Sequence, residues 1–137
     1  MKTRFLLALF LFLNVALLAQ SQDQILGKYW SPEKDAKIEI YKRNNSYFGK
    51  IIWAKNPRND IKNPDPAKRN QPVVGMEFLK NFTFKNGAWE DGTIYDAESG
   101  KTYDCIIKLN EDNNIKVRGY IGISLIGRTE TMERIKE

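Results

Sequence analysis

Four polar side chains in one loop are the residues best suited to do chemistry. Asp60, Asn63, Asp65 and Arg69 occur within a stretch that holds four of the chain's five prolines, at positions 57, 64, 66 and 72. Two carboxylates, an amide and a guanidinium held by prolines can bind a polar ligand group through charge-assisted hydrogen bonds. The same residues can instead form Asx turns and an Arg–Asp pair that only hold the loop in place. Both interpretations stay open at this point.

The loop itself is long for a small domain. Residues 56–75 form a polar insertion between two apolar runs. Connections longer than about 12 to 15 residues are uncommon in compact domains, and they usually bind something or act as a lid. The residues before Pro64 and Pro66 are pushed out of the helical region, and residues 67–70 can add one helical turn capped by Asp65. We therefore predict a stiff, ordered loop.

Several classes of catalytic site are missing from the composition. The chain has no histidine and one cysteine, Cys105, so His-dependent triads and internal disulfides are excluded. Asp60, Asn63 and Asp65 are oxygen ligands of the kind calcium uses, but their spacing does not match an EF-hand loop. We predict no metal, no cofactor and no catalytic residue. Hydrolysis by a carboxylate pair such as Asp60 and Asp96 is the least favoured alternative.

The first 21 residues are typical of a signal peptide. Lys2 and Arg4 precede an apolar run over residues 5–18, and Ala19-Gln20-Ser21 supplies small residues for cleavage. Cleavage there leaves 20 basic and 17 acidic residues, a net charge of +3. The charged residues are distributed along the sequence, so we predict no nucleic-acid partner. We expect a secreted or periplasmic protein with no membrane span after cleavage, and residues 22–137 as a single domain.

The mature chain reads as a series of short strands. Apolar and polar residues alternate along it, and turn residues such as Asn86-Gly87 separate the apolar segments. The predicted strands cover residues 27–30, 36–42, 47–53, 76–84, 93–96, 102–109, 115–120 and 128–135. No amphipathic helix of ten or more residues is predicted.

Short turns between alternating strands favour an all-β, antiparallel up-and-down barrel of about eight strands, because closure hides the apolar face. A two-sheet sandwich is the alternative. A barrel of this size can be filled by side chains or can hold one small ligand. Trp53, Tyr95, Tyr103 and Tyr120 can therefore line a ligand cavity or simply complete the core.

An ordered set of residues resembles a known family. The set comprises Asp60, Asn63-Pro64-Asp65-Pro66, Arg69, Pro72, Gly75, Gly92, Ile94-Tyr95-Asp96, Ser99-Gly100-Lys101, Tyr103, Arg118-Gly119-Tyr120, Gly122, Gly127-Arg128 and Arg134. Their order and spacing are similar to those of domain-of-unknown-function family 2147, over essentially all of the mature chain. The chain departs from the family pattern at Ala97, at Met132 and in the spacing between Gly27 and Trp30.

The resemblance implies an exported bacterial protein with a lipocalin-like barrel, and no established activity. It also implies that Trp30 on the first strand plugs one end of the barrel, with Arg134 lying over its ring in a cation–π contact. Arg128 is the substitute partner if the register of the first strand is shifted.

Three functional hypotheses follow. The leading one is a non-enzymatic protein that binds a small hydrophobic or amphiphilic ligand in the barrel or at its mouth, with the loop nearby. The second is an envelope structural or protein-interaction module with a solid barrel, which includes the option of a homodimer. The third is the carboxylate-dependent hydrolase.

Overall fold

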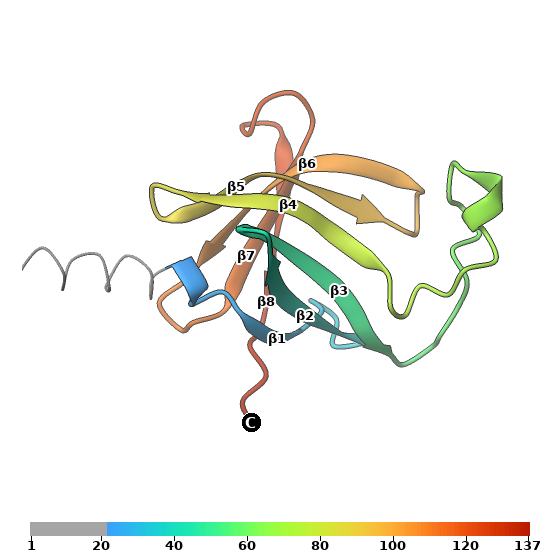
Figure 1. The fold of residues 1–137 in the computed structure, drawn as a ribbon, viewed down its shortest axis with the longest axis horizontal. Helices are drawn as coiled ribbons and strands as arrows, with labels where there is room; N and C mark the ends of the chain where they lie inside the picture. Colours follow the sequence, from blue (N-terminus) through green and yellow to red (C-terminus); the bar gives the residue numbers. More distant parts are fainter. Residues whose placement is uncertain (1–21) are drawn as a thin grey trace, which may run out of the picture.

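Eight strands form a single antiparallel sheet in which each strand pairs with the next one along the chain (Figure 1). The computed structural model describes residues 22–137, so the predicted signal peptide lies outside the described residues. The strands are β1 (Gly27–Trp30), β2 (Ala36–Arg43), β3 (Ser46–Ala54), β4 (Glu77–Lys85), β5 (Ala88–Asp96), β6 (Lys101–Leu109), β7 (Ile115–Tyr120) and β8 (Gly127–Met132). Every predicted strand is present, but the last one ends at Met132 and not at residue 135, beyond which Arg134 forms only an isolated bridge with Tyr29.

The turn residues explain where most strands end, and one bulge corrects a predicted boundary. Asn86 and Gly87 have φ angles of 51° and 81°, as a two-residue hairpin turn between β4 and β5 requires. Asp91 also has a positive φ, of 63°, but it lies inside β5 where the register shifts between Trp89 and Gly92. The strand therefore begins at Ala88 instead of residue 93, because Asp91-Gly92 form a bulge and not a lead into the strand.

The two edges of the sheet meet after β8 has ended. The backbone N–H of Trp30 donates to the carbonyl of Glu133 at 2.7 Å, and the N–H of Ile135 donates to the carbonyl of Lys28 at 2.8 Å. Between these bonds Tyr29 pairs with Arg134 in an antiparallel bridge. One curled sheet of up-and-down strands, with its edges joined in this way, confirms the barrel. The alternative of two stacked sheets is wrong.

Large side chains occupy the inside of the sheet. Tyr29, Tyr47, Phe82 and Trp89 are each at most 2% exposed and belong to one core cluster that draws on all eight strands. Gly92 faces this cluster because a Cβ there would overlap the Phe82 ring. Cys105 is also fully buried, and burial raises the pKa of its thiol to about 12. The middle of the barrel is therefore packed by side chains.

One end of the barrel is covered by residues 22–26, and we call it the closed end. The phenol of Tyr47 donates to the carboxylate of Asp23 at 2.6 Å, and the indole N–H of Trp89 donates to the carbonyl of Gln22 at 3.2 Å. The phenol of Tyr29 donates to the carbonyl of Ile25 at 2.7 Å, and Ile25 is fully buried. These bonds attach the N-terminal segment to three buried aromatic residues.

Arg134 completes the closed end, but with a different partner from the one predicted. Its guanidinium carbon lies 4.8 Å from the ring centroid of Tyr29, and its nitrogens donate to the carbonyls of Gln24, Leu26 and Asn113 at 2.6–2.9 Å. The predicted contact with Trp30 is therefore wrong by one residue. Strand alternation places Tyr29 inside and Trp30 outside.

Arg128 does not serve as the substitute partner. Its side chain is 86% exposed and pairs with Glu130 at 3.0 Å, at the start of β8 and far along the strand from β1's partner residues 133–135. The extra residue between Gly27 and Trp30 explains the shift in the first strand, because Tyr29 now stands two positions after the glycine and takes the inward position.

The short turns at residues 44–45, 86–87 and 110–114 lie at the closed end. The opposite end, which we call the loop end, carries the other four connections between strands: residues 31–35, 55–76, 97–100 and 121–126. The long polar loop is the largest of these and projects beyond the sheet (Figure 1). Within residues 22–137, no helix has the length and apolar character needed to cross a membrane.

Candidate functional site

The long loop is built around the buried carboxylate of Asp60, which is 3% exposed. One carboxylate oxygen accepts from the phenol of Tyr95 on β5 at 2.7 Å, and the other accepts from the amide of Asn63 at 2.8 Å. Burial, together with the bond to Asp60, raises the pKa of Tyr95 to about 12. Asp60 therefore joins the loop to the barrel wall.

The rest of the loop is held by its own hydrogen bonds. Asp65 accepts from the backbone N–H of Ala67 at 3.1 Å and caps the short 3-10 helix η1 (Pro66–Lys68), as predicted for this turn. The guanidinium of Arg69 donates to the carbonyl of Asn63 at 2.8 Å, and not to a carboxylate. The predicted polar set thus forms an internal network that orders the loop, in agreement with the structural interpretation.

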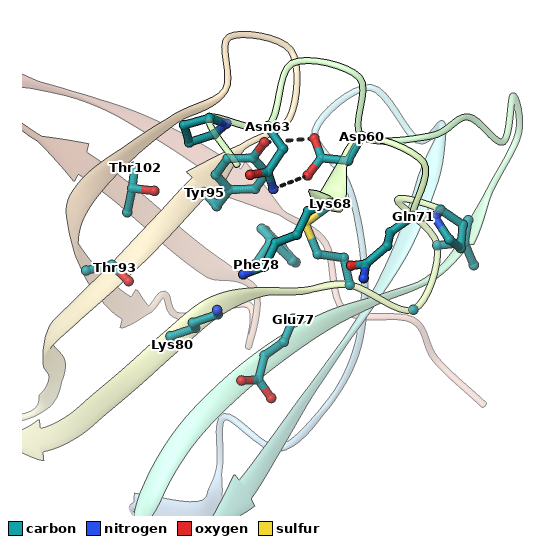
Figure 2. A pocket seen from close by; sticks show the side chains of 15 residues that line it. Asp60, Asn63, Lys68, Gln71, Glu77, Phe78, Lys80, Thr93, Tyr95 and Thr102 are labelled. Carbon is teal, nitrogen blue, oxygen red and sulfur yellow. Dashed lines mark hydrogen bonds between the residues drawn. The ribbon is translucent and has the colours of Figure 1, made fainter. Parts of the chain in front are cut away.

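A cleft of about 570 Å³ lies between this loop and β4, β5 and β6. Figure 2 shows Asp60, Asn63 and Tyr95 joined by hydrogen bonds on one side, with side chains of the strands opposite. Its lining residues are Asp60, Asn63, Pro64, Lys68, Gln71, Pro72, Val74, Gly75, Met76, Glu77, Phe78, Lys80, Thr93, Tyr95 and Thr102. The volume falls within the range of small-molecule sites.

The walls of the cleft combine an apolar floor with two lysines. Phe78 is 7% exposed and lies beneath the loop, next to Met76, which packs against the same core cluster. Lys68 reaches into the cleft from η1, and Lys80 reaches in from β4 (Figure 2). Neither ammonium group forms an ion pair with any residue in the range 22–137. Two like charges in one cleft repel each other unless an anion lies between them.

Both acidic side chains that line the cleft, Asp60 and Glu77, already accept hydrogen bonds from other residues. Glu77 accepts hydrogen bonds from the phenol of Tyr41 and the guanidinium of Arg43. Burial opposes ionisation of Glu77, but the two hydrogen bonds together with the positive charges of Arg43 and Lys80 lower the pKa of its carboxyl group. Glu77 therefore lines the cleft as a carboxylate, and its charge is neutralised mainly by the guanidinium of Arg43 at 3.1 Å.

The predicted site residues divide between the cleft and other surfaces. Asp60, Asn63 and Tyr95 line the cleft, whereas Asp65 and Arg69 stabilise the loop behind it.

The other three aromatic residues lie away from the cleft. Trp53 is 41% exposed beside Trp30, with ring centroids 6.1 Å apart. Tyr103 is on the inner face of β6, in register with Ile94, and Tyr120 is on the outer face, in register with Asp104. No single cavity therefore gathers the four predicted aromatic residues.

Sequence reasoning missed the residues that give the cleft its charge and its floor. Lys68, Phe78 and Lys80 have no motif of their own. Lys80 is exposed on β4, whereas Phe78 is buried next to Leu79 in the core cluster at a register shift between β3 and β4. No local signal could have found them, because an exposed lysine and a buried phenylalanine are ordinary in any small domain.

The two carboxylates named in the hydrolase hypothesis, Asp60 and Asp96, each accept hydrogen bonds from neighbouring residues. Both oxygens of Asp60 accept hydrogen bonds, and Asp96 accepts from Glu98 and Ser99 within the turn between β5 and β6. Among the described residues, no group of three acidic or cysteine side chains is arranged to hold a metal ion.

Comparisons with known proteins agree with this architecture. The sequence matches the profile of a family described as "Uncharacterized protein conserved in bacteria (DUF2147)" over residues 27–134. No curated protein matches the chain significantly in sequence. The structure is similar to one described as "Protein HP1028 from the human pathogen Helicobacter pylori belongs to the lipocalin family", at 21% identity and a TM-score of 0.76, covering 82% of this chain and 84% of that one. At this level of identity the likeness establishes a lipocalin-like fold.

Proposed function

This chain belongs to the DUF2147 family of bacterial proteins, and we propose that it is a non-enzymatic protein that binds a small, partly apolar anion in the cleft at its loop end. The lipocalin-like fold supports a binding role because barrels of this kind often take small ligands at their mouths. The apolar run at residues 5–18 and its flanking residues support export to the periplasm or the medium.

The observation that carries the proposal is the presence, above an apolar floor, of two lysines that form no ion pair within residues 22–137. Lys68 and Lys80 provide two donors for a carboxylate, sulfonate or phosphate group. Phe78, Met76 and Val74 provide a surface for an aliphatic or aromatic portion of the same molecule. The buried network at Asp60 holds the loop before binding, which lowers the entropic cost of ordering it.

A direct test uses two probes with this chemistry. Dodecanoate combines a carboxylate with an alkyl chain, and 1-anilinonaphthalene-8-sulfonate combines a sulfonate with aromatic rings. We expect one molecule of either probe to bind per chain. Lys68→Gln/Lys80→Gln should weaken binding at least tenfold, because each lost charge-assisted hydrogen bond contributes about 1.5 to 3 kcal/mol. Calorimetry measures dodecanoate binding, and fluorescence measures the sulfonate.

The matched control is Lys108→Gln/Lys116→Gln. These two exposed lysines lie opposite each other on β6 and β7, so the control removes the same total charge from a surface remote from the cleft. Its affinity for both probes should equal that of the wild type. Equal losses of affinity in the two double variants would show that only the net charge matters. An undiminished affinity in Lys68→Gln/Lys80→Gln would rule out the proposed site.

The packed middle of the barrel favours the second hypothesis, an envelope interaction module without a ligand. The aromatic pair Trp30 and Trp53 supports it, since both rings lie on the outer surface with the ammonium of Lys37 at 4.9 and 5.5 Å from their centroids. Native mass spectrometry after incubation with a bacterial lipid extract separates the two functions. A retained small molecule supports the binding protein, and a bare chain that dimerises supports the interaction module.

A further inference from the structure

The loop between β7 and β8 exposes an unusual concentration of aliphatic side chains. Ile121 is 69% exposed, Ile123 56%, Leu125 85% and Ile126 65%, so four of six consecutive residues present large apolar side chains to solvent. Single exposed aliphatic residues are normal on protein surfaces, whereas contiguous groups mark interaction sites. Figure 1 shows this loop as a tip that projects beyond the ends of the strands.

Five of the six backbone carbonyls of residues 121–126 accept hydrogen bonds from within the described chain. The carbonyls of Ile121, Ile123 and Ile126 accept from backbone N–H groups within the loop at 2.9, 3.1 and 3.3 Å respectively. The guanidinium of Arg118 donates to the carbonyls of Ser124 and Leu125 at 2.7 and 3.4 Å. A carbonyl that already has a partner can leave water at little cost, whereas an unpartnered one cannot enter an apolar phase.

The charges of the chain favour an anionic surface beyond the tip. Residues 55–76, at the same end of the barrel, contain five basic and two acidic residues, whereas the rest of the described chain contains 15 of each. The whole net charge of residues 22–137 therefore resides in the long loop. At the base of the tip, Arg118 is bonded to the tip itself and Arg128 pairs with Glu130, while the acidic groups of Asp104, Asp91 and Glu90 act on Tyr120.

From these features we propose that residues 121–126 insert into the surface of a lipid bilayer, with the loop end of the barrel turned toward the membrane. A convex aliphatic tip has no groove to receive a protein partner, but it fits a deformable lipid surface. Bilayers with anionic headgroups also complement the positive long loop. This inference is independent of the ligand proposed for the cleft.

The test is flotation with vesicles made of equal parts phosphatidylcholine and phosphatidylglycerol. The wild-type chain should float with the vesicles, and Ile123→Ser/Leu125→Ser should bind at least tenfold more weakly, because two aliphatic side chains no longer enter the bilayer. All variants are produced in the same way and share one N-terminus, so the difference between them reports the loop alone. Both replaced side chains are exposed, and thermal unfolding without lipid should be unchanged.

Ile61→Ser is the matched control. Ile61 is 64% exposed on the long loop, so it has the same chemistry and exposure at another place on the same end, and its replacement should leave binding unchanged. Leu125→Trp adds a positive readout, since its fluorescence should shift to shorter wavelength on vesicles and be quenched by lipids labelled in the acyl chain.

Three outcomes would overturn the proposal. These are a wild-type chain that stays unbound, binding that is insensitive to Ile123→Ser/Leu125→Ser, and lipid-free self-association that the same substitutions abolish. In the last case the tip is a contact between two copies. Retention of 1-anilinonaphthalene-8-sulfonate binding in the serine variant would show that the cleft is intact, so failure here and failure of the proposed ligand site are distinguishable.

Discussion

The two ends of the barrel differ in how far their side chains are buried and bonded. At the closed end, Tyr29, Tyr47, Trp89 and Arg134 hold the N-terminal segment against the core with hydrogen bonds of 2.6–3.2 Å. At the loop end, by contrast, lie all of the large apolar side chains that are exposed among the described residues: Trp53, Ile61, Ile121, Ile123, Leu125 and Ile126. The closed end contributes stability, and the loop end offers surfaces that other molecules can contact.

The comparison also explains why the loop end can vary without loss of the fold. Met76, at the end of the long loop, packs against the core cluster, but no buried member of that cluster and none of the backbone bonds between residues 133–135 and β1 comes from the long loop or the tip. Loops carry function because a rigid scaffold positions them without depending on them. Changes at the closed end should therefore lower global stability, whereas changes at the loop end should act locally.

Replacing Arg134 with methionine should have the largest effect on stability. The substitution removes three side-chain hydrogen bonds to backbone carbonyls and the contact with the Tyr29 ring, and it leaves partly buried carbonyls without partners. We expect the free energy of unfolding to fall by about 2–4 kcal/mol, measured by urea denaturation. Arg128→Met, at an exposed ion pair, should cost less than about 0.5 kcal/mol. Equal losses of unfolding free energy in Arg134→Met and Arg128→Met would contradict a stabilising role specific to the closed end.

An intermediate effect is expected from Asp60→Ala at the loop end. The change leaves the phenol of Tyr95 and the amide of Asn63 without their acceptor, at a local cost of about 1–2 kcal/mol. Trypsin should then cleave at Lys62, Lys68 or Arg69 roughly tenfold faster, while urea denaturation changes less than in Arg134→Met. Asp65→Ala, which removes only the cap of η1, should have the smaller effect. A global loss of stability as large as that of Arg134→Met would contradict the separation of the two ends.

The smallest predicted effect is a loss of stability at alkaline pH, which is absent at neutral pH. Burial raises the pKa of Tyr29 to about 12, with Arg134 opposing the shift only in part, and burial and Asp60 raise that of Tyr95 to about 12. In the unfolded chain these phenols lose their protons near pH 10. Their contribution to the free energy of unfolding is therefore fully present below pH 10 and is lost between pH 10 and 12. Tyr29→Phe should flatten this decline in global unfolding, and Tyr95→Phe should flatten it only in hydrogen exchange of residues 56–75. If instead Tyr95→Phe changed global unfolding and Tyr29→Phe changed only the exchange of residues 56–75, the roles of the two ends would be reversed.

The strands and their order could be predicted because they depend on local patterns. Alternation of apolar residues and turn dipeptides such as Asn86-Gly87 identified all eight strands, and the helical turn capped by Asp65 was also correct. Asp91-Gly92 were misassigned because the same residue types that end a strand also form a bulge inside one. Arg134 was identified correctly as a structural residue, but its ring partner was not, because the choice between Tyr29 and Trp30 depends on which of them faces inward.

The candidate site was predicted only in part for a related reason. Asp60, Asn63 and Tyr95 were recognisable from the resemblance to the family and from the loop chemistry. Lys68, Phe78 and Lys80 carry no local signature, since they belong to the site only through the way the loop folds against β4. Trp53, Tyr103 and Tyr120 were grouped with Tyr95 by residue type, although the register of the strands places them on three different surfaces.

The sequence by itself determined the all-β architecture, the strand order and an ordered polar loop, because these follow from alternation, turn residues and prolines acting over a few neighbouring positions. Only the tertiary structure decided which ring Arg134 covers, where the cleft lies and which aliphatic residues remain exposed. Those outcomes depend on contacts between residues far apart in the chain, such as Arg134 with Leu26 and Tyr95 with Asp60. Such contacts exist only after the sheet has curled and its first and last strands have met.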